Sequence, residues 1–305
     1  MTTPSAPDAA RPRRLTQVDV FGSTGATSGN PVAVVHDAEG MSTEEMAAFA
    51  RWTNLSETTF LLAPEHPDAD YRVRIFTPGQ ELPFAGHPTL GTAHAWLEAG
   101  GVPARDGVVV QECGVGLVDV RRGIGGRLAF AAPPLVRSGP PTPDDLAVVR
   151  ELLGLAEDAV VDAAWTDNGP GWLTLLLRDA DAVLAVRPGP VTAEVRRRGL
   201  VDLGLVGPHP AGSEVAVEVR AFFLAGTDAW TEDPVTGSLN AGVAVWLGGG
   251  GLPTSYVAAQ GTALGRAGRV HVELDPHDPA GIWWIGGETR STIRGEVSLD
   301  GAPRG

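Results

Sequence analysis

Two stretches of the chain decide the fold: residues 86–101, GHPTLGTAHAWLEAGG, and residues 237–251, GSLNAGVAVWLGGGG. Small and apolar residues occupy nearly every position in both, and glycines close each stretch. A helix that is apolar around most of its circumference has to be buried on all sides, and a curled sheet provides such surroundings. The sequence therefore predicts one enclosed central helix in each half of the chain.

The two stretches also align with each other. Trp96 matches Trp246 at an offset of 150 residues, and a similar strand motif precedes each stretch, VRIF at 73–76 and VRAF at 219–222. Order and spacing agree as well as residue identity. This repetition predicts a duplicated α+β fold of two domains, in which each domain is a sheet curled around its central helix.

A proline-rich segment separates the two halves. Residues 133–143 hold five prolines among eleven positions. We expect an N-terminal domain over residues 15–132, completed by the C-terminal segment at about 288–300, and a C-terminal domain over residues 142–287. The leader, residues 1–14, is predicted to be a disordered tail.

Composition excludes several classes of function. The 37 acidic side chains outnumber 23 basic ones and give a formal net charge of −14, which argues against binding to nucleic acid. The chain contains no lysine, so no side-chain amine is present to form a Schiff base. The single cysteine, Cys113, excludes an intrachain disulfide and a Cys-x-x-Cys metal or redox site, and it is interpreted as structural. No apolar run approaches the roughly 18 residues of a membrane span, and a cytoplasmic location is expected.

A glycine-rich loop at residues 22–29 follows a strand-like segment, as in dinucleotide-binding proteins. A pyrophosphate loop must open a helix, whose free N–H groups face the phosphate. Here the strand-like residues 30–35, NPVAVV, follow instead, so the loop is predicted to be a hairpin turn. Further along, Ser42 and Glu45 have capping-box spacing and predict a helix that ends near Trp52.

The loops before the two central helices are the candidate functional site. The N–H groups of a helix's first turn have no partners within the helix and attract anions. If the two halves face each other, the two helix starts form a site for a carboxylate or a developing enolate. The loops read PFAGHPT at 83–89 and TEDPVTGS at 231–238, and we expect residues 79–85 and 226–233 to move when a ligand binds.

Five segments resemble signature segments of the phenazine biosynthesis PhzF-like family. They are Phe21…Gly29-Asn30-Pro31-Val32-Ala33-Val34, NLSETTF at 54–60, FAGHPT at 84–89, EDPVTGS at 232–238, and Gln260-Gly261-Thr262…Gly265-Arg266. The resemblance covers about residues 15–298. It implies the diaminopimelate-epimerase-like fold, with two similar domains, the site between them, and a homodimeric assembly.

The resemblance also implies a role for each candidate residue. Glu57 would be the general acid/base, and its position before an apolar strand favours a raised pKa. His87 would orient the substrate or relay a proton, and Asp233 would hydrogen-bond the substrate amine or the histidine. The expected substrate-binding residues are Gly86, Gly237, Ser238, Asn30 and Ser56.

The sequence thus predicts an isomerase that needs no cofactor or metal and moves a proton on a small amino- or hydroxy-carboxylate. Thiol racemases of this fold place a cysteine in each loop, and both loops here lack one. Two alternatives stay open. The same groups would bind a small anion without turnover, and Ser238, His87 and Asp233 would compose a hydrolase triad, although no Gly-x-Ser-x-Gly elbow surrounds Ser238.

Overall fold

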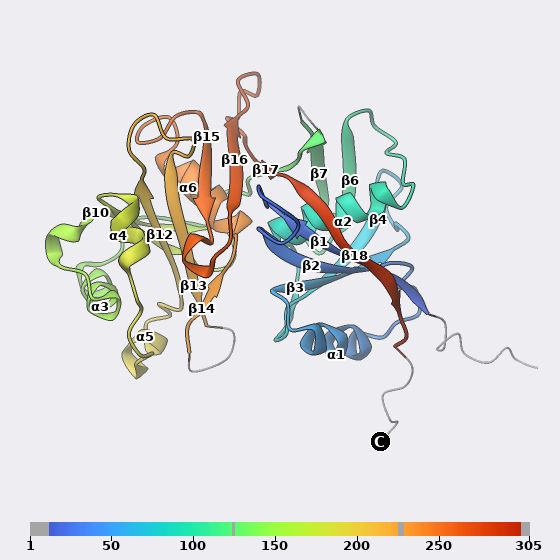
Figure 1. The fold of residues 1–305 in the computed structure, drawn as a ribbon, viewed down its shortest axis with the longest axis horizontal. Helices are drawn as coiled ribbons and strands as arrows, with labels where there is room; N and C mark the ends of the chain where they lie inside the picture. The colour runs from blue at the N-terminus through green and yellow to red at the C-terminus, as the bar shows by residue number, and fades with distance from the viewer. Residues whose placement is uncertain (1–11, 124–125, 225–228, 300–305) are drawn as a thin grey trace, which may run out of the picture.

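A computed structural model of the chain describes residues 12–123, 126–224 and 229–299. Within these residues, hydrogen bonds join the strands into one continuous sheet, which folds into two lobes that lie side by side (Figure 1). Residues 1–11, most of the predicted tail, lie outside the described residues. None of the described helices is long and apolar enough to cross a membrane.

Among the described residues, the N-terminal lobe contains the first eight strands, two helices and the last strand. Its elements are β1 (Arg13–Val20), β2 (Asn30–Val35), α1 (Thr43–Thr53), β3 (Glu57–Leu62), β4 (Tyr71–Phe76), β5 (Glu81–Leu82), α2 (Gly86–Glu98), β6 (Val108–Cys113), β7 (Gly116–Arg122), β8 (Leu128–Ala131) and β18 (Thr289–Val297). The predicted capping box of α1 is confirmed, because Ser42 and Glu45 each bond the other's backbone N–H.

The C-terminal lobe contains the remaining elements. They are β9 (Arg137–Gly139), α3 (Pro143–Leu153), β10 (Val160–Asp167), β11 (Leu173–Leu177), α4 (Ala180–Ala185), α5 (Ala193–Arg197), β12 (Asp202–Pro208), β13 (Val217–Phe223), β14 (Thr231–Asp233), α6 (Gly237–Leu247), β15 (Ser255–Gln260), β16 (Gly268–Leu274) and β17 (Trp283–Gly287). Short 3-10 turns lie at Glu157–Ala159 and Thr262–Leu264.

Strand pairing repeats from one lobe to the other, which confirms the predicted duplication. In the N-terminal lobe β2 runs parallel to β3 and β4 parallel to β6, and the neighbouring pairs are antiparallel. In the C-terminal lobe β11 runs parallel to β12 and β13 parallel to β15, again between antiparallel pairs. An edge strand completes each lobe, β18 beside β1 and β9 beside β10.

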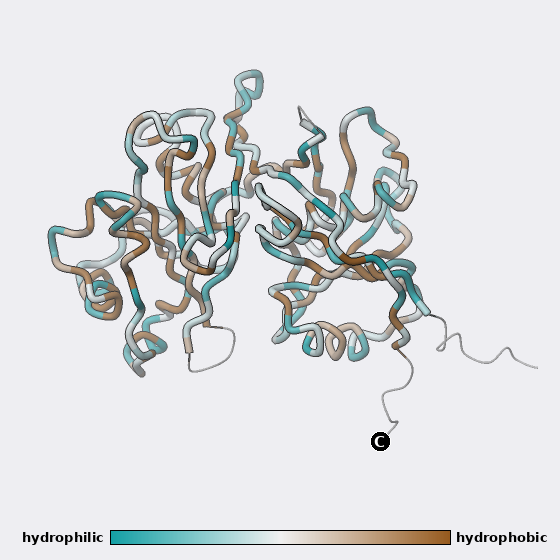
Figure 2. The backbone as a smooth tube through the Cα atoms, viewed as in Figure 1, coloured by the Kyte–Doolittle hydropathy of each residue, from teal (hydrophilic) through white to brown (hydrophobic). Residues whose placement is uncertain are grey.

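Each central helix is enclosed by its own sheet, and this is why both sequences are rich in small residues. A Cβ atom added to Gly91 of α2 would lie 2.3 Å from Cγ1 of Val32. A Cβ atom added to Gly242 of α6 would lie 2.4 Å from the carbonyl oxygen of Thr166. Apolar segments accordingly concentrate within the lobes, and hydrophilic segments gather in the outer loops (Figure 2).

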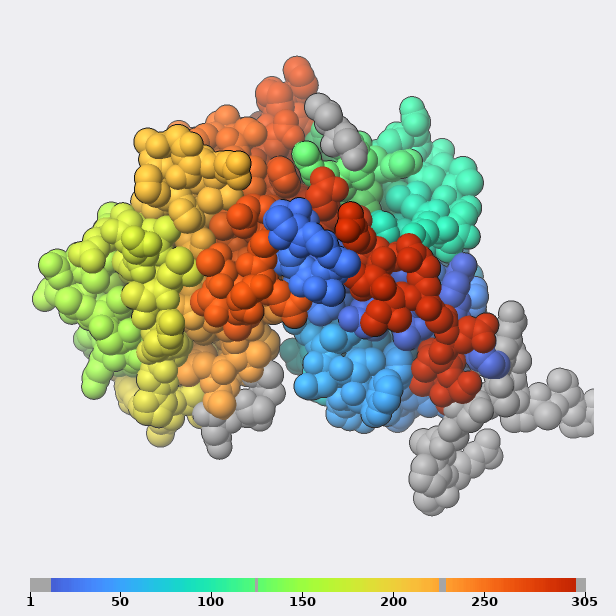
Figure 3. All heavy atoms as spheres, in the orientation of Figure 1, coloured from blue at the N-terminus to red at the C-terminus, as the bar shows by residue number. Residues whose placement is uncertain are grey.

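The lobes are joined both by hydrogen bonds between strands and by the chain itself. β17 pairs antiparallel with β8, so the two curled sheets share hydrogen bonds. The chain then returns in β18, which runs antiparallel along β1 (Figure 1). In the space-filling view the lobes are in contact through the middle of the molecule and separate toward α1 (Figure 3).

The structure differs from the sequence predictions at three boundaries. β1 already begins at Arg13, which pairs with Val297, so the tail ends before the predicted residue 14. Part of the proline-rich segment forms β9, because prolines flank residues 137–139 without interrupting them. Residues 231–233 of the loop expected to move are strand β14, whereas residues 225–228 lie outside the described residues. The domain limits at 132 and 142 stay predictions.

Candidate active site

The N-termini of the two central helices meet at one aromatic ring. A Cβ atom added to Gly237 would lie 3.1 Å from Cζ of Phe130 and 3.4 Å from Cα of Gly86. Neither helix has a side-chain cap within the described part of the chain, whereas the other four α-helices described there are capped by Ser42, Thr142, Asp179 and Thr192. Uncapped helix starts present free N–H groups and a positive dipole end, so this junction is suited to an anion.

Glu57 and His87 face each other beside this junction. Glu57 is the first residue of β3, and His87 lies in the first turn of α2. Oε2 of Glu57 lies 3.1 Å from Nδ1 of His87, and the two side chains are 15% and 4% exposed. Neither Oε2 of Glu57 nor Nε2 of His87 has a hydrogen-bond partner among the described residues. Buried polar atoms without partners are unusual in native proteins and are typical of sites that receive a ligand.

Burial shifts the pKa values of this pair in opposite directions. It raises the pKa of Glu57 well above its usual value, and the charge of Asp233 raises it further. Burial lowers the pKa of His87 to about 3, although a hydrogen bond to the Pro31 backbone opposes that shift. The imidazole is therefore neutral near pH 7, and the surroundings of Glu57 favour the protonated form of its carboxyl group.

Asp233 links the two lobes at the same site. Its Oδ1 accepts hydrogen bonds from Asn30 Nδ2 at 2.9 Å and Ser56 Oγ at 3.2 Å. Its Oδ2 accepts one from Thr236 Oγ1 at 2.6 Å. Burial raises the pKa of Asp233 to about 6, although these three hydrogen bonds lower it. No hydrogen bond joins Asp233 to His87 among the described residues, in contrast to one of the two roles expected for Asp233.

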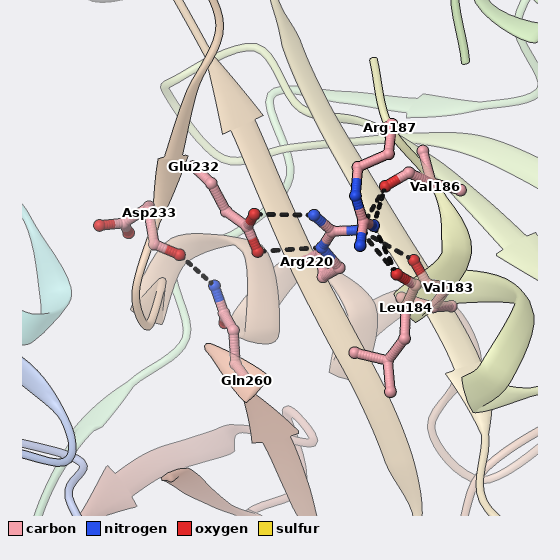
Figure 4. A network of polar contacts seen from close by, with 8 residues as sticks. All are labelled: Val183, Leu184, Val186, Arg187, Arg220, Glu232, Asp233 and Gln260. Carbon is pink, nitrogen blue, oxygen red and sulfur yellow. Dashed lines mark hydrogen bonds and ion pairs between the residues drawn. The ribbon is translucent and has the colours of Figure 1, made fainter. Parts of the chain in front are cut away.

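Buried polar contacts hold the strand that carries Asp233. Arg220 of β13 is 3% exposed at its side chain and binds both carboxylate oxygens of Glu232, at 2.9 and 2.8 Å (Figure 4). Arg220 also donates to the carbonyl oxygens of Val183 and Val186 at the end of α4. Gln260 Nε2 donates to the carbonyl oxygen of Asp233 at 3.2 Å. These contacts fix β14 and hence the position of Asp233.

Ser238 is the second residue of α6 and is not its N-cap. Its hydroxyl accepts a hydrogen bond from Trp172 Nε1 at 3.0 Å, and its carbonyl oxygen accepts one from Asn168 Nδ2 at 2.9 Å. The N-cap is Thr236, whose hydroxyl bonds Asp233 instead of the helix backbone. Among the described residues, Ser238 makes no hydrogen bond to His87, so the geometry of a hydrolase triad is not present.

The comparisons with known proteins identify the family of the chain. The family described as phenazine biosynthesis-like protein matches residues 18–295. The chain belongs to this family. "Antisense-enhancing sequence 1" of Schizosaccharomyces pombe is 34% identical over 92% of this chain and 97% of its own length. The trans-2,3-dihydro-3-hydroxyanthranilate isomerase of Pseudomonas aeruginosa is 55% identical over 82 residues, which cover 27% of this chain and 29% of the relative.

Solved structures of the phenazine biosynthesis-like family share the fold. The family protein of Bacillus anthracis superposes with a TM-score of 0.77 at 22% identity, over 94% of this chain and 99% of the other. Other relatives that align with most of the chain are named as uncharacterized isomerases. This member of the family is accordingly an isomerase with the diaminopimelate-epimerase-like fold.

The structure adds five residues to the candidate site of this family member. Phe130 forms its floor, Thr236 and Gln260 hold Asp233, and Asn168 and Trp172 hold Ser238. Gln260 and Thr236 lie in family-like segments of the sequence, so a sequence signal for these two residues exists. Phe130, Asn168 and Trp172 lie outside those segments, and only the folded chain brings them together.

Arg74, Arg266 and Cys113 make other contacts in this family member. Arg74 binds Glu81 through two hydrogen bonds of 2.7 Å, and Arg266 donates to the carbonyl oxygen of Thr27. Cys113 is half-buried, and burial raises the pKa of its thiol. In the described ranges, no group of three or more His, Cys, Asp and Glu side chains is arranged to hold a metal ion.

Proposed function

We propose that this isomerase moves a proton between two carbons of a small amino- or hydroxy-carboxylate, with Glu57 as the general acid/base. The observation that carries the proposal is the buried Oε2 of Glu57, which lies 3.1 Å from a neutral His87 and has no hydrogen-bond partner among the described residues. A carboxyl group with a raised pKa accepts and returns a proton near neutral pH. A single such group suffices when the proton leaves one carbon and reaches the other on the same face of the substrate.

The remaining residues bind and orient the substrate in this proposal. The free N–H groups at Gly86, Gly237 and Ser238 receive the substrate carboxylate. Asn30 and Ser56 hold Asp233, whose negative charge favours the protonated form of Glu57. His87 fixes the orientation of the Glu57 carboxyl group. No step requires a bound cofactor, because a conjugated substrate stabilises the developing negative charge itself.

A relative's name suggests the first substrate to test. The Pseudomonas aeruginosa relative is named for trans-2,3-dihydro-3-hydroxyanthranilate, a conjugated ring that carries a carboxylate, an amine and a hydroxyl group. These are the groups expected of a substrate here. Cytoplasmic location and a homodimeric assembly belong to the same proposal.

The test compares the parent protein with Glu57→Gln, which keeps the shape of the side chain and removes the proton carrier. Isomerisation of trans-2,3-dihydro-3-hydroxyanthranilate in D₂O is followed by NMR, which reports turnover and deuterium incorporation together. We expect the rate to fall by at least about a hundredfold. Glu44→Gln changes an exposed glutamate in the first turn of α1 and serves as the control.

Three outcomes would count against this proposal. An unchanged rate in Glu57→Gln would remove Glu57 from the mechanism. Tight binding to the parent protein with no isomerisation and no deuterium exchange would favour a binding protein without turnover. Stoichiometric labelling of Ser238 by a fluorophosphonate would favour the hydrolase alternative.

A further inference from the structure

The duplicated fold places a second carboxylate where Glu57 has its counterpart. β4 and β13 carry the matching motifs VRIF and VRAF. Thr58 pairs with the last residue of the first motif, and Leu203 pairs with Phe222, the last residue of the second. The residues that precede Thr58 and Leu203 are Glu57 and Asp202. Glu57 and Asp202 therefore occupy the same position in the two lobes.

The side chain of Asp202 points toward the central helix of its lobe. In β12, Leu203 and Leu205 pack into the apolar cluster on the outer face of the sheet. Gly204 lies on the opposite face, because a Cβ atom added there would be 2.5 Å from Cδ1 of Leu239 in α6. Side chains alternate between the two faces of a strand, so Asp202 shares the inner face with Gly204. Glu57 has the same relation to α2, because Thr59 on the same face of β3 accepts a hydrogen bond from Thr92 of α2.

The loop that holds Ser238 lies against Asp202. A Cβ atom added to Gly171 would be 3.6 Å from Oδ2 of Asp202. The next residue, Trp172, donates to the Ser238 hydroxyl, and Asn168 of the same loop donates to its carbonyl oxygen. Asp202 is thus connected through one short loop to the start of α6, where the substrate carboxylate is proposed to bind.

Asp202 has no hydrogen bond or ion pair to another side chain within residues 12–123, 126–224 and 229–299, although it is partly buried. Burial and the nearby Asp167 raise the pKa of Asp202 to about 7. Asp167 itself accepts hydrogen bonds from the N–H groups of Gly169 and Gly171. A carboxylate in such surroundings lacks a donor or cation, which a bound molecule can supply.

We propose that Asp202 contacts the substrate and accepts hydrogen bonds from its amine when the substrate carboxylate lies at the start of α2 and α6. The inference rests on the proposed function, and it assigns the contact with the substrate amine to Asp202 instead of Asp233. Three donors within the protein already bind the oxygens of Asp233, and Glu57 is the proposed proton carrier. Asp202 has neither role: it lies beside the loop that holds Ser238, and among the described residues it makes no hydrogen bond or ion pair to another side chain. An amino-carboxylate would therefore span the junction from the helix starts to β12.

Two stable ligands separate this contact from carboxylate binding. Cyclohexanecarboxylate carries the anion alone, and trans-2-aminocyclohexanecarboxylate adds an ammonium group on the neighbouring carbon. Affinities are measured by NMR titration near pH 8 for the parent, Asp202→Asn and Asp158→Asn, an exposed control with the same change of charge. We expect Asp202→Asn to lower the affinity for trans-2-aminocyclohexanecarboxylate about tenfold or more. The affinity for cyclohexanecarboxylate should change less than about twofold. The control variant should leave both affinities unchanged.

The outcomes separate this inference from the proposed function. If the parent prefers the amino ligand and Asp202→Asn keeps that preference, Asp202 is the wrong residue and the helix-start site stands. If Asp202→Asn weakens both ligands equally, Asp202 has a structural role only. If the parent binds neither ligand, the carboxylate site fails and the amine contact fails with it. Thermal unfolding of each variant establishes that a lost affinity does not reflect a lost fold.

Discussion

Asn30 Nδ2 donates a 2.9 Å hydrogen bond to Oδ1 of Asp233 and thereby joins the start of β2 to the end of β14. The same nitrogen donates to the carbonyl oxygen of Val235 at 3.0 Å, and Asn30 is fully buried. Ser56 makes a second, longer contact with Asp233 across the lobes. The position of Asp233 relative to Glu57 therefore depends on a polar contact between the two halves of the duplication.

A double-mutant cycle tests this contact. We expect Asn30→Ala and Asp233→Ala each to lower the free energy of unfolding by about 1–3 kcal/mol, because each leaves a buried partner unsatisfied. The double variant should lose less than the sum of the two losses, with a coupling energy above about 0.5 kcal/mol. Urea unfolding at constant pH gives all four values. Additive losses would mean that the two side chains do not stabilise each other.

Raised pKa values predict how stability depends on pH. A carboxyl group whose pKa is higher in the folded state binds its proton more tightly there, so stability falls as the pH rises between the unfolded and folded values. Asp233, with a pKa raised to about 6, and Asp202, raised to about 7, both contribute in this direction. Glu98 acts oppositely but only below about pH 4.5, because Arg294 lowers its pKa to about 2. Burial lowers the pKa of His36 to about 4 and the pKa of His87 to about 3, so these two groups act in the opposite direction between pH 5 and pH 7, and the share of one carboxyl group is measured by comparing variants.

Asp202→Asn isolates one part of this pH dependence. One proton held by the native state and lost by the unfolded state changes stability by up to about 1.4 kcal/mol per pH unit. From pH 5 to pH 7 the free energy of unfolding should therefore fall less, or rise more, in this variant than in the parent or Asp158→Asn, measured by urea unfolding at each pH. An identical pH dependence in all three proteins would mean that Asp202 titrates alike in the folded and unfolded states.

Local sequence signals were sufficient for much of the fold. Ser42 and Glu45 form a capping box because their spacing alone brings each side chain to the other's backbone. The aligned motifs at Trp96 and Trp246 predicted two enclosed helices, since small apolar residues have few alternatives to burial. The motif-bearing residues Glu57 and His87 do face each other. These features depend on contacts within a short segment or on a repeated pattern.

The features that the sequence did not predict depend on contacts between distant segments. β9 forms because residues 137–139 find an open edge on β10, which no local pattern indicates. Ser238 lies in a family-like segment, but nothing in the sequence indicates that Trp172 donates a hydrogen bond to its hydroxyl. Asp202 lies in no family-like segment, and only the strand registers relate it to Glu57. Contacts between distant segments therefore depend on strand register and on the positions of loops, which motifs do not specify.

The burial of His87 predicts its protonation state and which substitutions at this position retain activity. Because burial lowers its pKa to about 3, the imidazole should stay neutral from pH 5 to pH 8, which the ¹⁵N shifts of selectively labelled histidine report. His87→Asn retains a polar group near Glu57, whereas His87→Leu does not. We expect the asparagine variant to retain at least about tenfold more isomerase activity than the leucine variant. Equal activities would show that His87 acts only by filling space.

The meeting of Gly86 and Gly237 at Phe130 predicts unequal effects of two alanine substitutions. A Cβ atom on Gly86 would lie 2.3 Å from Cζ of Phe130, a distance at which the ring or the helix has to shift. A Cβ atom on Gly237 would lie 3.1 Å from the same atom, which small adjustments can accommodate. Gly86→Ala should therefore lower the free energy of unfolding by about 1–3 kcal/mol, as overpacked cores do, and Gly237→Ala by less.

Ligand binding further distinguishes the effects of substitutions at Gly86 and Gly237. Gly237→Ala adds a methyl group beside the free N–H groups of α6, so it should weaken cyclohexanecarboxylate binding severalfold while the fold persists. Phe130→Leu makes room at the ring and should restore much of the stability lost in Gly86→Ala when the two changes are combined. Thermal unfolding and NMR titration measure the two effects on the same samples. If Gly237→Ala bound the carboxylate as tightly as the parent, the anion would have to lie away from the start of α6, and the helix-start site would be excluded.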